Sequence, residues 1–191
     1  MTLAVEAGSG PRQGERSATA LVAGAGITLL ALRVLILGSP SAGMQLAGIY
    51  LMLGIVSVAV PVATNERHSL SAPVVVAIGL VALGAASLVA GPRAPLAHGT
   101  EALALSSLAA VSEEAFFRRF LYGRLLRYGP VAAIGISAML FAVIHVPAYG
   151  VAVFWVDLGA GLLLSWQRWA SGGWAAPAAT HLAANILAVI R

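Results

Sequence analysis

The chain has 191 residues, of which 60% are hydrophobic and 9% are charged, and it contains no cysteine. This composition is typical of a membrane protein, and the missing cysteines exclude disulfides, thiolate metal ligands and a cysteine nucleophile. The formal net charge of +4 comes from arginines that lie mostly at the ends of apolar segments, so it indicates membrane orientation and excludes nucleic acid as the expected partner.

Seven apolar segments are candidates for membrane-spanning helices, since a spanning helix needs about 20 mostly apolar residues. In chain order they cover residues 18–37, 43–63, 72–90, 98–117 or beyond, 130–146, 150–167 and 174–190. The connections between them are short, and no soluble domain separates them. The sequence therefore predicts an all-α fold, a polytopic transmembrane helical bundle with about seven spanning helices.

Residues 1–17 are rich in Gly, Ser and Arg and predict a disordered cytosolic tail. The apolar run 18–37 that follows has a competing interpretation as a signal peptide, because arginines precede it and Ser-Pro-Ser-Ala-Gly follows it. The apolar core of a signal peptide is typically about 7–15 residues long, and this run is longer. We therefore interpret it as the first span.

The arginines predict the orientation of the bundle. With the N-terminus in the cytosol, the outer side holds only Arg93 and Arg191, while Arg33 lies within a span. The inner side then holds Arg12, Arg16, Arg67, Arg118, Arg119, Arg124, Arg127 and Arg168. This positive-inside bias predicts a cytosolic N-terminus. Every basic residue is arginine and alanine is abundant, which favours a bacterial genome, so we expect an integral protein of the bacterial cytoplasmic membrane.

Polar residues within the spans are concentrated in the second half of the chain. The first half has only Arg33, whereas the second has Glu113, Glu114, Arg118, His145, Asp157, His181 and Asn185. A charge at the bilayer centre costs about 2.5–3.5 kcal/mol on insertion scales, so such residues usually face a cavity or a partner. We therefore divide the chain into the tail (1–17), a scaffold of transmembrane helices (18–97) and a working core (98–191). Asp157 is expected to pair with Arg33 or to line the cavity.

Three spans of the working core each carry two residues four positions apart, which share a helix face. The pairs are Glu114 with Arg118, Phe141 with His145, and His181 with Asn185. Four glycines, Gly24, Gly26, Gly159 and Gly161, are predicted to allow close packing of helices.

The depth of these residues in the membrane predicts the length of the fourth helix. At 1.5 Å per residue, His145 lies roughly 22 Å above the inner face. Glu113 reaches that level only if its helix continues to about Arg127, so we predict a long fourth helix. His181 comes out lower, at roughly 10 Å, and a tilt or an earlier helix start is needed to close the gap.

Two chemistries suit this set of residues. A carboxylate in a low-dielectric cavity is a suitable general base for activating water. Alternatively, Glu113, His145 and His181 are candidate ligands for a divalent metal such as zinc, which also activates water. Asn185 is suited to donating to a developing oxyanion or to orienting the imidazole of His181. Both chemistries predict hydrolysis of a carbonyl bond, whereas the serines show no nucleophile-elbow context.

At these residues the chain resembles a known family. The stretch EEAFFR (113–118) fits an EExxxR motif, FAVIH (141–145) an FxxxH motif and HLAAN (181–185) an HxxxN motif. In this order and spacing they resemble the CPBP intramembrane proteases, also called the type II CAAX prenyl endopeptidase or Abi family. The resemblance covers about residues 100–190.

The resemblance implies a membrane protease whose site lies in a cavity open toward the cytosol. It implies that Glu113 activates water, that His145 positions it, and that His181 and Asn185 stabilise the oxyanion. Glu114 and Arg118 would then support the site. Members of the family are described both as metalloproteases and as glutamate proteases, so the cofactor stays open between a divalent metal and none, with the residues slightly favouring none.

The resemblance also implies a peptide or protein substrate, either lipidated or bound to the membrane, with the lipid bilayer as the second partner. The sequence assigns no oligomeric state. Two other functions suit intramembrane Glu, His and Arg, namely a proton-coupled transporter and a non-catalytic scaffold or immunity protein. A transporter predicts repeat symmetry and polar residues in both halves, so their concentration in the second half favours the endopeptidase.

Overall fold

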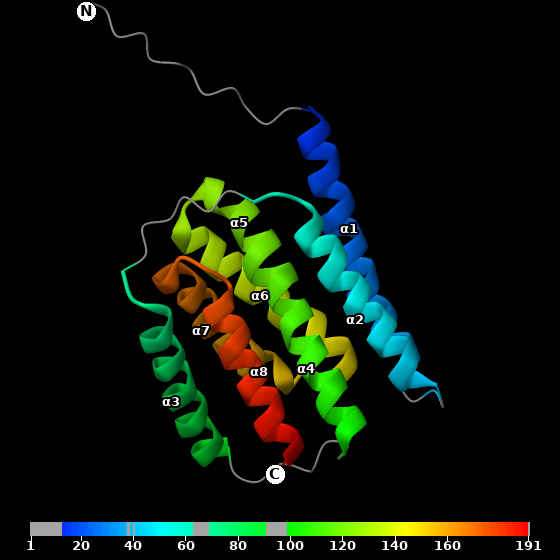
Figure 1. The fold of residues 1–191 in the computed structure, drawn as a ribbon, viewed down its shortest axis with the longest axis vertical. Coiled ribbons are helices and arrows are strands. Elements are labelled where there is room, and N and C mark those ends of the chain that lie inside the picture. Colours follow the sequence, from blue (N-terminus) through cyan, green and yellow to red (C-terminus); the bar gives the residue numbers. More distant parts are fainter. Residues whose placement is uncertain (1–12, 38, 40, 63–68, 91–98, 191) are drawn as a thin grey trace, which may run out of the picture.

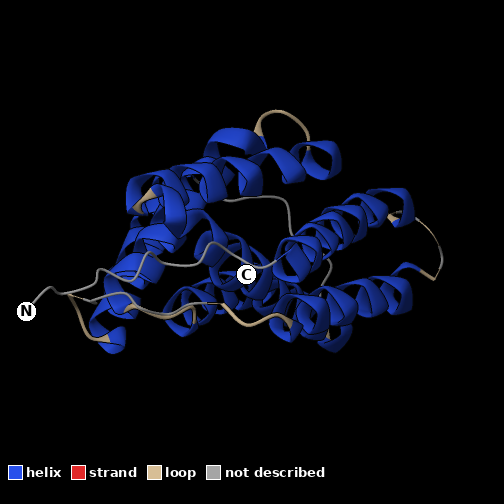
Figure 2. Ribbon diagram, turned by 90° about the horizontal axis from the view of Figure 1, so that it is seen from above, coloured by secondary structure: helices blue, strands red, loops and turns tan. Residues whose placement is uncertain are grey.

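The computed structural model describes residues 13–37, 39, 41–62, 69–90 and 99–190, and these are helical apart from short turns (Figure 2). The helices are α1 (Gln13–Ile36), α2 (Ala42–Ala59), α3 (Ala72–Ala90), α4 (Thr100–Glu114), α6 (Pro130–Tyr149), α7 (Val153–Ser171) and α8 (Ala175–Ile190). α4 runs on through the π-helix η1 (Ala115–Leu121), α5 (Tyr122–Leu125) and the 3₁₀ turn η2 (Leu126–Tyr128). When α4 to η2 is counted as one rod, the described residues form seven helical rods, and the predicted all-α bundle is confirmed.

The rod from α4 to η2 is the predicted long fourth helix, and it lies at the centre of the bundle. It packs against α2 on one side and α8 on the other, while α6 and α7 pack extensively on each other. Figure 1 shows α1 and α2 together along one flank and α3 on the opposite flank. The central position of this rod places Glu113 and Glu114 where helices from both halves of the chain reach them.

Bulky aromatic residues of η1 form the main core. The ring of Phe116 packs edge-on to Phe117, with centroids 5.1 Å apart, and stacks on Phe120 at 5.9 Å. These rings pack among Leu30, Tyr50, Leu53, Ala109 and Phe141. π-helical turns are rare and occur frequently at functional sites, and this one begins directly after Glu114.

The distribution of polar and apolar side chains is that of a membrane protein. Leu35, Met44 and Val131 expose 79–83% of their surface, whereas Arg33, Glu114 and Arg118 expose 1% or less. Among the residues that the structure describes, three stretches are long and apolar enough to cross a bilayer, namely Arg16–Ile36, Ala42–Ala59 and Pro130–Tyr149, and the apolar helices Ala72–Ala86 and Ala175–Ile190 are shorter. A bundle with apolar side chains outside and charged ones inside suits lipid as its solvent.

The first helix begins earlier than expected. α1 starts at Gln13, so residues 13–17 of the predicted tail are helical, and residues 1–12 lie outside the described part of the chain.

Two arginines expected at the inner face bind backbone carbonyls of neighbouring helices. Arg119 donates from Nη1 to the carbonyls of Ser57, at 2.6 Å, and Val60, at 3.2 Å, at the C-terminus of α2. Arg168 is buried and donates from Nε to the carbonyl of Arg118 at 3.1 Å. The last carbonyls of a helix lack partners within it, and lipid provides no donors, so a nearby guanidinium satisfies them.

Two of the four glycines predicted at packing positions fill that role. A Cβ on Gly161 would lie 3.0 Å from both the Cα and the carbonyl oxygen of Ala138, and a Cβ on Gly26 would overlap the ring of Phe116. Gly24 and Gly159 have no atom within 4 Å of that position, so the prediction is wrong for them. α6 and α7 therefore approach closely at Gly161.

Replacing Gly161 with valine is expected to destabilise the protein by about 1–3 kcal/mol, because the branched side chain must push α7 away from α6. Thermal or denaturant unfolding of the purified protein in detergent measures the effect. Gly159→Val is the matched control on the same helix and is expected to unfold like the wild type. Equal stability of the two variants would contradict close packing at Gly161.

Candidate active site

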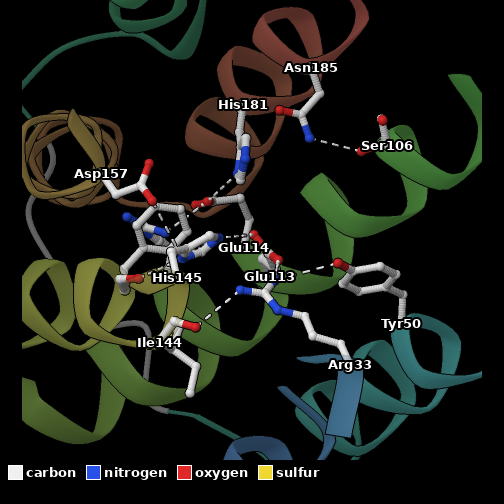
Figure 3. Close-up of polar contacts among 12 residues, drawn as sticks. Arg33, Tyr50, Ser106, Glu113, Glu114, Ile144, His145, Asp157, His181 and Asn185 are labelled. Carbon is white, nitrogen blue, oxygen red and sulfur yellow. Dashed lines mark hydrogen bonds and ion pairs between the residues drawn. The ribbon is translucent and has the colours of Figure 1, made fainter. Parts of the chain in front are cut away.

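Glu113 lies near the middle of the long central helix and is 3% exposed. Its Oε1 accepts a hydrogen bond from Nη1 of Arg33 at 2.7 Å, and its Oε2 faces Nε2 of His145 at 3.6 Å (Figure 3). The two carboxylate oxygens therefore have separate neighbours, a guanidinium on α1 and an imidazole on α6.

The orientation of His145 is set by its own helix. Nδ1 lies 2.6 Å from the carbonyl oxygen of Phe141, so Nδ1 carries the proton and donates it to that carbonyl. In the neutral ring Nε2 then has the free lone pair, and it is Nε2 that faces Glu113. The FxxxH spacing thus has a physical role, because the residue four positions back provides the acceptor that selects this tautomer.

Asp157 lies beside the same histidine. Its Oδ2 is 3.9 Å from Nδ1 of His145, which is too long for a hydrogen bond. The expected pairing of Asp157 with Arg33 is not formed, because Arg33 is bound to Glu113. Asp157 lies beside His145 instead, and the alternative that it lines a cavity stays a prediction.

Glu114 is fully buried and binds two partners through one oxygen. Its Oε1 accepts from Nη1 of Arg118 at 2.8 Å and lies 2.8 Å from Nδ1 of His181. Nη2 of Arg118 donates to the carbonyl of Gly161 on α7 at 3.2 Å. The predicted pairing of Glu114 with Arg118 is confirmed. His181 binds the same oxygen of Glu114.

Asn185 does not orient the imidazole of His181. Its Nδ2 donates to the backbone carbonyl of Ser106 at 3.0 Å, which ties α8 to α4 (Figure 3). Glu114 is the group that holds His181. The role of Asn185 toward an oxyanion stays a prediction.

Phe141 forms an apolar wall shared by both histidines. Its ring centroid lies 4.5 Å from that of His145 and 5.8 Å from that of His181. The guanidinium carbon of Arg118 lies 4.4 Å from the same centroid, a cation–π contact. Phe141 therefore packs within the cluster, as the sequence predicts.

Two residues that contact the group around Glu113 come from the half of the chain predicted to be a scaffold. Arg33 on α1 is 1% exposed and binds Glu113, and Tyr50 on α2 lies 3.4 Å from Nη1 of Arg33 through its hydroxyl. The signal for Arg33 was present, since a lone charge within a span needs a partner. Nothing in the sequence around Tyr50 marks it.

The residues proposed as metal ligands do not form a metal-binding group. Within the described ranges, no three His, Asp or Glu side chains are arranged to hold a metal ion. Glu113 and His145 face each other, but Nδ1 of His181 is directed at Glu114. We therefore derive no step through a metal.

Replacing Arg118 with methionine leaves Glu114 without its cation in the fully buried core. Removing one partner of a buried ion pair typically costs about 3–5 kcal/mol, and we expect a loss of that order in the free energy of unfolding in detergent. Arg127→Met, at an exposed position of the same rod, is the control and is expected to unfold like the wild type. An Arg118→Met protein as stable as this control would contradict the assignment.

Comparison with known proteins agrees with this geometry. Residues 97–187 match the family described as type II CAAX prenyl endopeptidase Rce1-like. No curated protein and no solved structure matches the chain. The matched segment contains the three motifs and the six predicted site residues, whereas Arg33 and Tyr50 lie outside it. Residues 97–187 of this integral membrane protein therefore form a domain that belongs to the type II CAAX prenyl endopeptidase Rce1-like family.

Proposed function

We propose that the protein is an intramembrane endopeptidase that hydrolyses a peptide bond with water activated by Glu113. The observation that carries the proposal is the opposition of Glu113 Oε2 and His145 Nε2, 3.6 Å apart in a buried cluster. A general base and a second polar group that face each other in this way can both hydrogen-bond one water molecule.

In the proposed reaction, that water donates one proton to Oε2 of Glu113 as its oxygen attacks the carbonyl carbon of the peptide. His145 helps to position the water through Nε2, because its Nδ1 proton is bound to the Phe141 carbonyl. The tetrahedral intermediate then breaks its carbon–nitrogen bond, and Glu113 returns the proton to the leaving amine. The products are one carboxylic acid and one amine, and transfer of a proton between them gives carboxylate and ammonium.

His181 is proposed to stabilise the oxyanion of that intermediate. Its Nδ1 is bound to Glu114, so only Nε2 can turn to the substrate, and it donates there when the ring carries both protons. Asn185 joins as a second donor when its amide turns from the Ser106 carbonyl to the oxyanion.

The proposed substrate is a peptide or protein held at the membrane by a lipid group. The description of the matched family names prenylated CAAX sequences, in which the lipid is attached to a cysteine close to the cleaved bond. The apolar outer surface of the bundle supports a substrate that approaches within the bilayer. No metal is included in the proposed mechanism.

The protein is also proposed to lie in a bacterial cytoplasmic membrane with its N-terminus in the cytosol. Arg119, Arg124 and Arg127 lie toward the end of the central rod, and the first turns of α1 lie at the same end of the bundle (Figure 1). A cluster of arginines at one end of a bundle is typical of the cytosolic side.

The orientation can be tested by single cysteines because the chain has none of its own. Val151→Cys, in the turn between α6 and α7, should react with a membrane-impermeant maleimide in intact cells. Tyr128→Cys, at the opposite end of α6, should react only after the membrane is opened. Both side chains are well exposed, at 75% and 61%. The reverse labelling pattern would show that the orientation is inverted.

Glu113→Gln and His145→Ala are expected to lower peptide cleavage by about 10²–10⁴-fold, the usual contribution of a positioned acid–base group. The assay uses purified protein in liposomes and an internally quenched peptide ending in a farnesylated CAAX sequence. The same peptide without the farnesyl group tests the lipid requirement, and a chelator arm tests for a metal.

Glu101→Gln is the matched control for this assay, because it removes an exposed carboxylate from the same helix. It should cleave at the wild-type rate. Equal turnover by the wild type, Glu113→Gln and His145→Ala would contradict the proposed function and favour a non-catalytic role.

A further inference from the structure

We propose that Arg33 is a positioning residue of this site, which holds one oxygen of Glu113 so that the other faces His145 and the water. The inference rests on the proposed function and extends the site beyond the matched domain. It assigns a role in the reaction to α1, which lies in the part of the chain predicted to be a scaffold.

The contact between Arg33 and Glu113 joins residues 80 positions apart in the chain. Nη1 lies 2.7 Å from Oε1, and the two side chains are 2% and 4% exposed. A charge-assisted hydrogen bond of this length is among the strong ones in proteins. Because Oε1 is bound in this way, Oε2 is the oxygen that remains for a water molecule.

Arg33 also contacts the helix segment that carries His145. Its Nη2 donates to the carbonyl of Ile144 at 3.3 Å. Ile144 directly precedes His145 on α6. The same guanidinium therefore binds the general base and the backbone next to its partner.

Two tyrosines restrict the movement of this guanidinium. The hydroxyl of Tyr50 lies 3.4 Å from Nη1, and the ring centroid of Tyr149 lies 5.9 Å from the guanidinium carbon. The ring of Tyr149 also stacks on His145, with centroids 5.9 Å apart. Arg33 is thus held on several sides, as a residue that fixes the geometry of others must be.

Lysine cannot replace these contacts in full. A guanidinium presents several donors in a rigid plane, whereas an ammonium is a point charge on a flexible stem. Lysine at position 33 would retain a cation for Glu113 but would not bind Glu113 and the Ile144 carbonyl in the same fixed geometry. Arg33→Lys is therefore expected to be intermediate between the wild type and Arg33→Gln.

The test measures kcat and KM for the farnesylated quenched peptide with Arg33→Gln, Arg33→Lys and Arg119→Gln. Misplacement of a reacting group by about 1 Å can cost about 100-fold in rate, so we expect that loss in kcat for Arg33→Gln with KM little changed. The kcat of Arg33→Lys should be at least about tenfold higher than that of Arg33→Gln and still lower than that of the wild type. Arg119→Gln is the matched control, since Arg119 also links the first half of the chain to the central rod but donates to the carbonyls of Ser57 and Val60 at the C-terminal end of α2.

The outcomes separate this proposal from the proposed function. Wild-type kcat in Arg33→Gln or in Arg33→Lys would overturn the positioning role, as would an equal loss in Arg33→Gln and Arg119→Gln. If Arg33→Gln does not fold, the kcat of Arg33→Lys decides alone. Glu113→Gln is measured in parallel, and if it cleaves like the wild type the proposed function itself fails. A Glu113→Gln protein that is inactive beside a fully active Arg33→Gln protein overturns only the positioning role.

Discussion

Two adjacent carboxylates are buried on one helix, and the rest of the bundle is arranged to neutralise them. Successive residues of a helix project about 100° apart, so Glu113 and Glu114 face different neighbours and need separate cations. Glu114 finds its cation on the same rod, at Arg118, whereas Glu113 requires Arg33 from α1. An unpaired buried charge is strongly destabilising, so α1 must lie against the central rod for the structure to hold.

Hydrogen bonds to backbone carbonyls hold the remaining helices in place. Arg118 donates to the carbonyl of Gly161 on α7, and Arg168 on α7 donates back to the carbonyl of Arg118. The Gly161 carbonyl that Arg118 binds lies where α7 packs closely on Ala138 of α6. Between helices in lipid, packing and hydrogen bonds replace the hydrophobic driving force of water. Arg118 and Arg168 therefore hold helices of the bundle together.

Side-chain contacts within one helix could be predicted from the spacing of residues in the sequence. Contacts between helices could not. The pairing of Glu114 with Arg118 and the packing of Phe141 follow from a separation of four residues, and both are found. The pairing of Arg33 with Glu113 joins helices far apart in the chain, and only the fold determines which carboxylate an arginine meets. Asn185 shows the same limit, because its helical spacing from His181 was correct but its partner lies on α4.

The contacts of Arg33 and Tyr50 also bear on the choice between hydrolysis and transport. The concentration of polar residues in the second half no longer separates the two functions, because Arg33 and Tyr50 from the first half belong to the cluster. What favours hydrolysis is the way the groups are held. His145 is fixed by a carbonyl of its own helix with one nitrogen toward Glu113, and Glu113 is fixed by Arg33. Preorganised polar groups of this kind suit the stabilisation of a transition state, which is the use that the proposed hydrolysis makes of them.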